Sequence, residues 1–237
     1  MVRKFLNKKI IRLRNSSKVL KLIYYYHRLF HDKKLGNIGF DFTSKKTRLE
    51  IVQNIINLKN YNKYLEIGCY DDELFNHIKC SKKVGIDPVS GGTVRATSDQ
   101  FFLENKENFD CIFIDGLHEY HQVKKDISNS LNFLEDGGII LLHDCLPNNY
   151  YEQATPRCQW TWNGDVWKAI VEYRTFKDID VYTCYADQGI GVILKRPNRN
   201  LLDYKNKDYS NLGFQNFFHN NKTLMNIIEY DELIKII

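Results

Sequence analysis

Four short apolar runs constrain the fold of this 237-residue chain more than any other feature of its sequence. Each run is closed within two residues by an acidic residue or a glycine, and a polar or helix-like stretch follows. Near-continuous apolar strands that alternate with helices are typical of a parallel sheet covered on both faces. The runs, at residues 64–67, 84–86, 111–114 and 139–142, predict an α/β fold with a mostly parallel sheet.

Two of the intervening segments carry apolar residues at helical spacing. Residues 45–58 do so after a Thr-Ser pair at 43–44, which signals the start of a helix. Residues 119–134 show the same spacing, and we expect the glycine pair at 137–138 to end this helix and start the next strand. The sequence predicts a helix over each segment.

The last part of the sheet has a different character. After a predicted helix at 167–173 come two apolar runs, 181–185 and 190–194, which are joined by only four residues. So short a connection permits only an antiparallel pair, because a parallel return needs a crossover of about a dozen residues. We therefore predict that the sheet closes with an antiparallel hairpin.

The length of the chain allows one domain of ordinary size with appendages. We place a basic helical arm at residues 1–40, a catalytic domain at 41–200 and a helical extension at 201–237. The hydrophobic fraction of 43% is sufficient for a buried core.

Positive charge gathers at the N-terminus. Residues 1–35 hold eleven Lys and Arg against one Asp, and the remainder holds 23 basic against 28 acidic residues. Residues 5–30 mix these cations with apolar positions and predict one or two amphipathic helices. The arm fits adhesion to an anionic membrane surface, binding of an acidic substrate or nucleic acid, or a solvated cap or dimerisation element in a homo-oligomer.

Compartment signals favour the cytoplasm, with peripheral membrane contact through the arm as an option. The six cysteines form no CxxC pair, which favours reduced thiols. The N-terminus shows no signal-peptide core and cleavage site, and no apolar run approaches the roughly 20 residues of a membrane span.

The loop after the first run distinguishes between cofactors. In an open α/β sheet, ligands bind beyond the carboxyl ends of the strands. This loop has a single glycine, Gly68, and two carboxylates, Asp71 and Asp72, whereas a dinucleotide pyrophosphate needs several glycines and repels carboxylates. Asp87 follows Gly68 by nineteen residues, where an acid can bind ribose hydroxyls. The positive sulfonium and ammonium groups of S-adenosylmethionine (SAM) fit this loop better than NAD.

Five motifs carry a family resemblance over residues 63–195. The sequence resembles class I SAM-dependent methyltransferases, in particular the FkbM/macrocin-type and related sugar O-methyltransferases associated with glycan and capsule biosynthesis. The resemblance implies a Rossmann-like, seven-stranded sheet. The motifs are 64–68 (YLEIG), 85–88 (GIDP), 97–102 (TSDQFF), 113–120 (FIDGLHEY) and 137–145 (GGIILLHDC).

The resemblance also implies the cofactor contacts. One position departs from the family pattern, because Asp72 stands where the second glycine of ExGxxxG is usual, which leaves the geometry of the loop open. Solvated strand-end carboxylates and an ordinary turn glycine are the alternative interpretation. The implied contacts are Glu66, Gly68 and Tyr70 at the methionine part, Asp87 at the ribose, Ser98 and Asp99 at the adenine and Asp115 at the sulfonium, with Cys69, Pro88 and Gly116 beside them.

Methyl transfer to a hydroxyl needs positioning and a base. The candidates are His118, four residues beyond the strand that the resemblance makes the fourth, and His143, at the end of the fifth beside Asp144. An imidazole takes a proton near neutral pH, and an adjacent carboxylate can orient it. We favour His118 as the base, with His143 and Asp144 as its neighbours. Each histidine also fits a structural role as a hydrogen-bonded strand-end residue.

A metal-assisted reaction is the alternative. Some related O-methyltransferases hold a divalent cation with acids at these two strand ends, and Asp115 and Asp144 match two of the ligands. Where those families place a further Asp or Asn, this chain has Cys145, a soft ligand that suits Mg²⁺ poorly. A divalent metal is therefore possible but not favoured.

Residues 146–165, which we name the aromatic loop, lie between the last parallel strand and the next helix. A long connection at the cofactor edge of a sheet is normally functional. Its Trp160 and Trp162 can stack on sugar rings, and its Arg157 can bind an anionic group. Alternatively, the tryptophans are core or dimer contacts.

These features favour an enzyme that O-methylates a sugar or glycan precursor of a capsule or surface polysaccharide, with a small-molecule or glycan acceptor. An NAD(P)-dependent sugar oxidoreductase or epimerase is a first alternative, which the single-glycine loop disfavours. An RNA-directed methyltransferase that uses the basic arm is a second. The acidic body makes nucleic acid an unfavourable partner.

Overall fold

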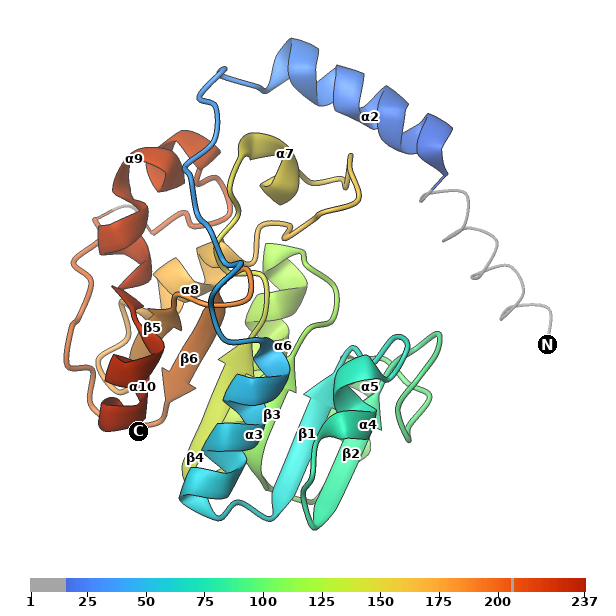
Figure 1. Ribbon diagram of the computed structural model, residues 1–237, viewed down its shortest axis with the longest axis vertical. Coiled ribbons are helices and arrows are strands. Elements are labelled where there is room, and N and C mark those ends of the chain that lie inside the picture. Colours follow the sequence, from blue (N-terminus) through green and yellow to red (C-terminus); the bar gives the residue numbers. More distant parts are fainter. Residues whose placement is uncertain (1–15, 206) are drawn as a thin grey trace.

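A computed structural model describes residues 16–205 and 207–237 (Figure 1). The part of the predicted amphipathic arm that precedes residue 16 lies outside the described residues. Of the helices that the structure describes, none combines the length and apolar character that a membrane span requires.

A seven-stranded sheet in the order β2-β1-β3-β4-β6-β5-β7 runs through the molecule (Figure 1). The four strands β2, β1, β3 and β4 are parallel, whereas β6 is antiparallel to both β4 and β5. This arrangement confirms the predicted α/β fold and its antiparallel hairpin. The strands are β1 Lys63–Ile67, β2 Lys82–Ile86, β3 Phe109–Ile114, β4 Leu134–Leu142, β5 Asp180–Cys184, β6 Ile190–Leu194 and β7 Ile227–Ile228.

Helices cover both faces of the sheet. Alternate residues of β3 enter two separate cores: Ile112 packs with α6, α8 and α9, and Phe113 packs with α3, α4 and α10. Burial on both faces explains why the strands read as continuous apolar runs. The helices are α2 Ser17–Phe30, α3 Arg48–Lys59, α4 Glu73–His77, α5 Ser98–Glu104, α6 Tyr120–Asn132, α7 Tyr150–Gln153, α8 Trp167–Tyr173, α9 Phe214–Met225 and α10 Tyr230–Ile236.

The start of α3 differs from the prediction. Its N-cap is Thr47, whose hydroxyl accepts from the backbone N–H of Glu50, while the Glu50 carboxylate accepts from the N–H of Thr47. This capping box satisfies two backbone donors at once, so it sets the helix start. Thr43 is not the cap, because its hydroxyl donates to Asp41.

The glycine pair Gly137 and Gly138 also lies elsewhere than predicted. Helix α6 already ends at Asn132, and both glycines are inside β4, beside an irregularity in its pairing with β3. Gly137 has φ +77°, and a Cβ on Gly138 would lie 2.8 Å from the backbone oxygen of Asp110. The pair therefore allows the strand to bend rather than ending the helix.

The strand count along the chain differs in one respect from what the resemblance implied. The resemblance placed Asp115 after the fourth strand and His143 after the fifth. In the structure Asp115 follows the third strand, β3, and His143 follows the fourth, β4. The reason is that the segment between β2 and α5 forms only an isolated parallel bridge, Ile86 to Val94, and not a strand. The sheet still has seven strands, because the C-terminal segment adds β7, which pairs with β5.

Candidate active site

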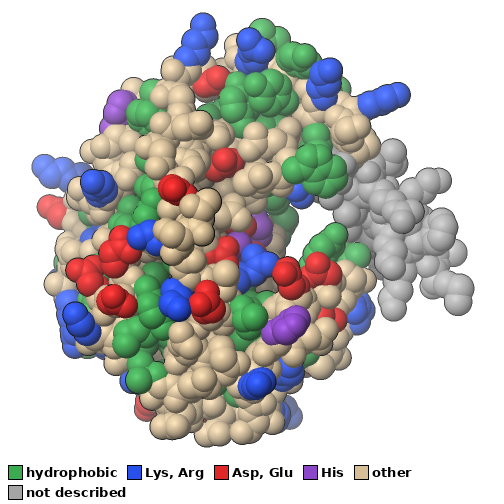
Figure 2. Space-filling view, in the orientation of Figure 1, with side chains coloured by type: hydrophobic (Ala, Val, Ile, Leu, Met, Phe, Trp, Pro, Cys, Tyr) green, Lys and Arg blue, Asp and Glu red, His purple; other side chains and the backbone are tan. Residues whose placement is uncertain are grey.

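A cavity of about 920 Å³ opens at the carboxyl ends of β1, β2, β3 and β4. Figure 2 shows a hollow on this face with histidine, acidic and basic side chains at its edge. Of the predicted site residues, only Asp99 does not line the cavity, because its carboxylate lies on the surface beside Lys125 and Gln122. The others line it: Glu66, Gly68, Cys69, Tyr70, Asp87, Pro88, Ser98, Asp115, Gly116, His118, His143, Asp144, Arg157, Trp160 and Trp162.

Gly68 lets two strand ends approach closely. Its φ is +93°, and a Cβ at this position would lie 2.2 Å from the backbone oxygen of Asp115. No side chain fits there, so the first loop and the end of β3 can meet only through a glycine. This contact brings the regions that carry Glu66 and Asp115 to one side of the cavity.

Asp72 stands at the position where the resemblance leads us to expect a glycine. Its backbone is left-handed, with φ +64°, a conformation that Asp and Asn tolerate better than most residues. Its carboxylate accepts a hydrogen bond from the backbone N–H of Gly92 at 2.5 Å. The departure from the family pattern is therefore compatible with the turn.

Asp87 is fixed by backbone donors. Its Oδ2 accepts from the N–H of Tyr70 at 3.0 Å, and its Oδ1 accepts from Val89 and Ser90 at 2.7 and 2.8 Å. A carboxylate held in this way also ties the loop after β1 to the loop after β2. The same side chain lines the cavity and shapes its wall.

Glu66 is an ionisable group in an apolar setting. Its side chain is 2% exposed and accepts a 2.6 Å hydrogen bond from the hydroxyl of Tyr64. Burial raises the pKa of Glu66 to about 7, although the Tyr64 hydrogen bond acts in the opposite direction. No Lys or Arg of the described residues forms an ion pair with it. The cavity thus contains a buried carboxyl that a cationic ligand would stabilise in its ionised form.

Two residues at the far end of the cavity were not predicted as site residues. Asp126 and Gln122, both on α6, line it beside Ser98. The Ser98 hydroxyl donates to Asp126 at 2.6 Å, and the Gln122 amide donates to the same carboxylate at 3.0 Å. Burial raises the pKa of Asp126 to about 6. An acid adjoining Ile127 on the apolar face of a predicted helix was the sequence signal for this site.

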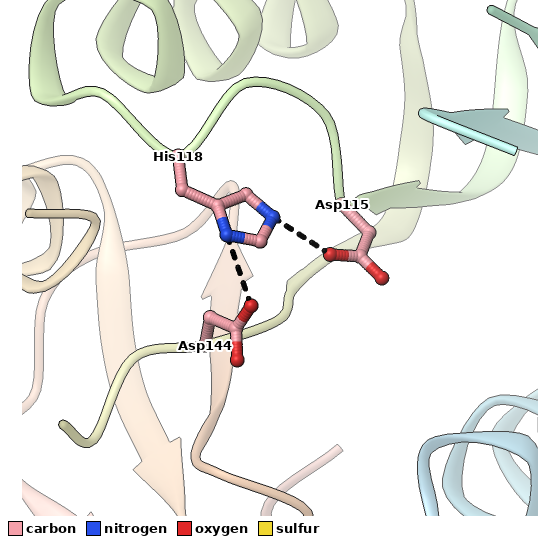
Figure 3. A group of neighbouring side chains, drawn as sticks. All are labelled: Asp115, His118 and Asp144. Atoms are coloured by element: carbon pink, nitrogen blue, oxygen red, sulfur yellow. Dashed lines mark hydrogen bonds and ion pairs between the residues drawn. The ribbon is translucent and has the colours of Figure 1, made fainter. Parts of the chain in front are cut away.

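Figure 3 shows His118 between two carboxylates. Its Nε2 lies 3.1 Å from Oδ1 of Asp115, and its Nδ1 lies 3.1 Å from Oδ2 of Asp144 and 3.0 Å from the backbone oxygen of Trp162. The imidazole also stacks on the Trp162 ring, with centroids 5.2 Å apart. Both ring nitrogens therefore have acceptors, and the aromatic loop fixes the plane of the ring.

His143 contacts the same two carboxylates. Its Nδ1 is 3.4 Å from Asp144 and 3.5 Å from Asp115, and its Nε2 is 3.2 Å from Oδ1 of Asp187. Asp187 comes from the β5–β6 turn and also accepts from the backbone N–H of Arg48. Neither Asp187 nor Arg48 was predicted, because only the assembled sheet brings the hairpin turn beside β4.

The carboxylates and imidazoles of this group shift one another's pKa values in opposite directions. Burial disfavours ionisation, but His143 and His118 outweigh it and hold the pKa of Asp115 well below its usual range. Conversely, Asp144 and Asp115 outweigh burial and raise the pKa of both His118 and His143. Both imidazoles therefore hold a proton more tightly than an ordinary histidine does, and each lies between carboxylates. The loss of a proton from His118 is accordingly shifted to higher pH than for an ordinary histidine.

A metal ion fits this group only in competition with protons. Ligand atoms of Asp115, His118 and Asp144 lie within 4.8 Å of one another, a donor set that suits Mn²⁺, Fe²⁺ or Zn²⁺ better than Mg²⁺. However, both nitrogens of His118 already face these carboxylates, so a cation would have to displace a proton or a contact of the imidazole. The thiol of Cys145 faces backbone oxygens instead. No step below depends on a cation.

The aromatic loop forms the opposite wall of the cavity. The guanidinium carbon of Arg157 lies 5.6 Å from the ring centroid of Trp160 and 5.7 Å from that of Trp162. A Cβ on Gly164 would lie 1.8 Å from the backbone oxygen of His118, so the end of the loop packs directly against the segment that carries this histidine. The wall therefore presents one cation and two flat rings to the cavity.

Residues 76–145 match a family model described as a methyltransferase domain. This segment contains Asp87, Asp115, His118, His143 and Asp144, and it begins after β1, the strand that carries Glu66. No curated protein matches the chain.

Three solved structures illustrate the similarities to known proteins. An O-methyltransferase from Bacillus cereus in complex with SAH is 12% identical over 76% of this chain and 100% of its own, with a TM-score of 0.46. The SAH-bound methyltransferase PaMTH1 from Podospora anserina is 16% identical over 75% and 87%, with a TM-score of 0.48. MycE, a methyltransferase from the mycinamycin biosynthetic pathway solved with Mg and SAH, is 12% identical over 67% and 51%, with a TM-score of 0.43.

Proposed function

We propose that the methyltransferase domain of this chain transfers the methyl group of SAM to a hydroxyl oxygen of a sugar or glycan precursor. One observation carries the cofactor assignment: a cavity at the carboxyl ends of the parallel strands contains Glu66, a buried carboxyl without a cationic partner among the described residues. A ligand with ammonium and sulfonium charges supplies what this carboxyl lacks.

Different residues of the cavity would bind different parts of the cofactor. Glu66 would bind the ammonium group of the methionine part, and Asp87 would place the ribose. Ser98, with the unpredicted Gln122 and Asp126, would surround the adenine. Bound SAM supplies an electrophilic methyl group, so the chain itself has to orient the acceptor and take up its proton.

His118 is the proposed proton acceptor. It lies between Asp115 and Asp144 and lines the cavity, so an acceptor hydroxyl that displaces one of these contacts can donate to an imidazole nitrogen of the neutral ring. The same carboxylates raise the pKa of His118, which makes it a stronger base once it has lost its own proton. Asp144 is held in turn by the amide of Asn163 at 3.1 Å, and His143 by Asp187.

The aromatic loop supports a carbohydrate acceptor. Sugar rings present apolar C–H faces that pack on flat aromatic side chains, and Trp160 and Trp162 offer two such surfaces at the cavity wall. Arg157, between them, would bind a phosphate or carboxylate on the acceptor. The proposed acceptor is therefore an anionic sugar, such as a phosphorylated glycan precursor.

Binding of SAM tests the proposal, and its pH dependence tests the role of Glu66. The pKa of Glu66 is raised to about 7, so the free protein holds this carboxyl neutral below that pH and ionised above it. A cationic ligand binds the ionised form, so calorimetric affinity for SAM should rise with pH through about 7. Glu66→Gln should weaken SAM binding about ten- to a hundredfold above that pH and abolish this dependence.

Stability provides the control for Glu66→Gln. Ionising a buried carboxyl opposes folding, so above pH 7 the variant should unfold at the same temperature as the wild type or higher. NAD, titrated in parallel, should give no heat of binding. Binding of NAD in preference to SAM would replace the proposal with the oxidoreductase.

Chelation tests the metal-independent reaction. Formation of the demethylated cofactor should be followed with sugar phosphates and nucleotide sugars as acceptors, before and after exhaustive treatment with a chelator. Because both nitrogens of His118 already face the carboxylates of the site, we expect the rate to stay within about twofold. A loss that Mn²⁺ or Mg²⁺ reverses would instead assign a divalent cation to Asp115 and Asp144.

A further inference from the structure

We infer that α2 is an interfacial helix, which binds the surface of an anionic lipid bilayer and holds the aromatic loop next to that surface. The inference concerns a face of the molecule outside the cavity, and it does not depend on the reaction proposed above.

The outer face of α2 is apolar and exposed. Leu22, Tyr25, Tyr26 and Leu29 recur at the i, i+3, i+4, i+7 spacing that places side chains on one side of a helix, and Phe30 adjoins them. Leu22, Leu29 and Phe30 are 71%, 75% and 69% exposed. A contiguous exposed apolar patch indicates a binding surface rather than a solvated face.

The opposite face of α2 is fixed to the aromatic loop (Figure 1). His27 is buried, with Nδ1 2.9 Å from the hydroxyl of Tyr150 and Nε2 3.1 Å from the backbone oxygen of Pro156. Tyr24 stacks on Tyr151 with ring centroids 4.4 Å apart, and the Tyr151 hydroxyl donates to Asp32. These contacts hold the helix in place, so its apolar outer face points away from the rest of the described chain.

Basic residues adjoin the apolar face. Lys21 and Arg28 lie along one side of it, Lys18 lies on the face itself one turn before Leu22, and Lys33 and Lys34 follow the end of the helix. Figure 2 shows hydrophobic and basic side chains together along the upper edge of the molecule, where Figure 1 places α2. Cations beside exposed apolar and tyrosine side chains are the composition of helices that lie in the headgroup region of anionic membranes.

A lipid surface explains these features better than a second copy of the chain does. In a symmetric dimer the same face meets itself, which would bring the basic residues beside this face in both copies into one contact. An anionic bilayer neutralises the cations and buries the apolar side chains in one contact. The occupant that fits both properties is therefore the lipid surface.

Vesicle sedimentation of the full chain tests the inference. The chain should sediment with vesicles of phosphatidylcholine and phosphatidylglycerol, and much less with phosphatidylcholine alone. Leu29→Gln combined with Phe30→Gln should weaken this partitioning at least about tenfold. Leu103→Gln removes a comparably exposed leucine on α5, 85% exposed, and should bind vesicles like the wild type.

Further measurements decide between occupants. Lys18→Gln with Lys21→Gln should reduce binding to the anionic vesicles and its sensitivity to salt. Circular dichroism and thermal unfolding should match those of the wild type in every variant. Unchanged vesicle binding by the Leu29/Phe30 variant, or no binding by the wild type, would overturn the inference. A dimer in light scattering that this variant dissociates would assign the face to a second copy instead.

Discussion

Gly68→Ala should remove measurable SAM binding, with a loss of at least about a hundredfold in affinity, and lower the free energy of unfolding by about 3 kcal/mol or more. The reason is steric. The new methyl group would have to occupy a position 2.2 Å from the backbone oxygen of Asp115 and 2.6 Å from the Cα of Gly116. Backbone atoms cannot rotate away as a side chain can, so the first loop and the end of β3 must separate. Calorimetry with SAM and urea unfolding measure the two effects.

Gly39→Ala is the matched control. Gly39 has the same φ of +93°, but nothing lies within 4 Å of the position that a Cβ would take. This variant bears only the cost of a left-handed alanine, about 1–2 kcal/mol, and should bind SAM like the wild type. If the two variants behaved alike, the close approach at Gly68 would not be what shapes the cofactor site.

His118→Asn should lower kcat by about 10²- to 10⁴-fold while SAM affinity stays within about threefold. An asparagine amide can keep one hydrogen bond to Asp115 or Asp144, but it cannot accept a proton from the acceptor. The contact between His118 and Asp115 is at the cavity wall, whereas Glu66 and Asp87 would hold the cofactor. Single-turnover formation of the demethylated cofactor separates the chemical step from binding.

His121→Asn provides the comparison for this variant. His121 is an exposed histidine on α6, three residues beyond His118, and it does not line the cavity. Its replacement should leave kcat unchanged. A His118→Asn variant with wild-type kcat would show that His118 only supports the aromatic loop through Trp162, and the search for the base would turn to Asp115.

The fold could be predicted largely because its strands are buried on both faces. The runs that became β1, β2, β3 and β4 are apolar at nearly every position, and each ends where a loop must carry polar groups to the sheet edge. Parallel strands bring these ends together, so Asp115 and His143 could be placed at one edge from the sequence. The apolar pattern of the sequence was therefore sufficient to predict the parallel strands and the sheet edge that carries Asp115 and His143.

Other elements depend on contacts that the sequence does not display. Asp187 meets His143 only because β6 pairs antiparallel with β4, and the two residues are 44 positions apart. The irregularity in β4 that requires Gly137 likewise arises from its pairing with β3. Strand β7 has two residues, too few for any pattern, and forms because its neighbour β5 offers a free edge.

Under the proposed function, the two hydrogen bonds of His27 link α2 to the loop that would bind the acceptor. A histidine near the start of the chain helps to set the position of Tyr150 and Pro156, more than a hundred residues later. A change in residues 146–165 that suits a new acceptor also has to remain compatible with the contacts that α2 makes with this segment. Substitutions that broaden specificity should therefore arise in pairs, one in each segment.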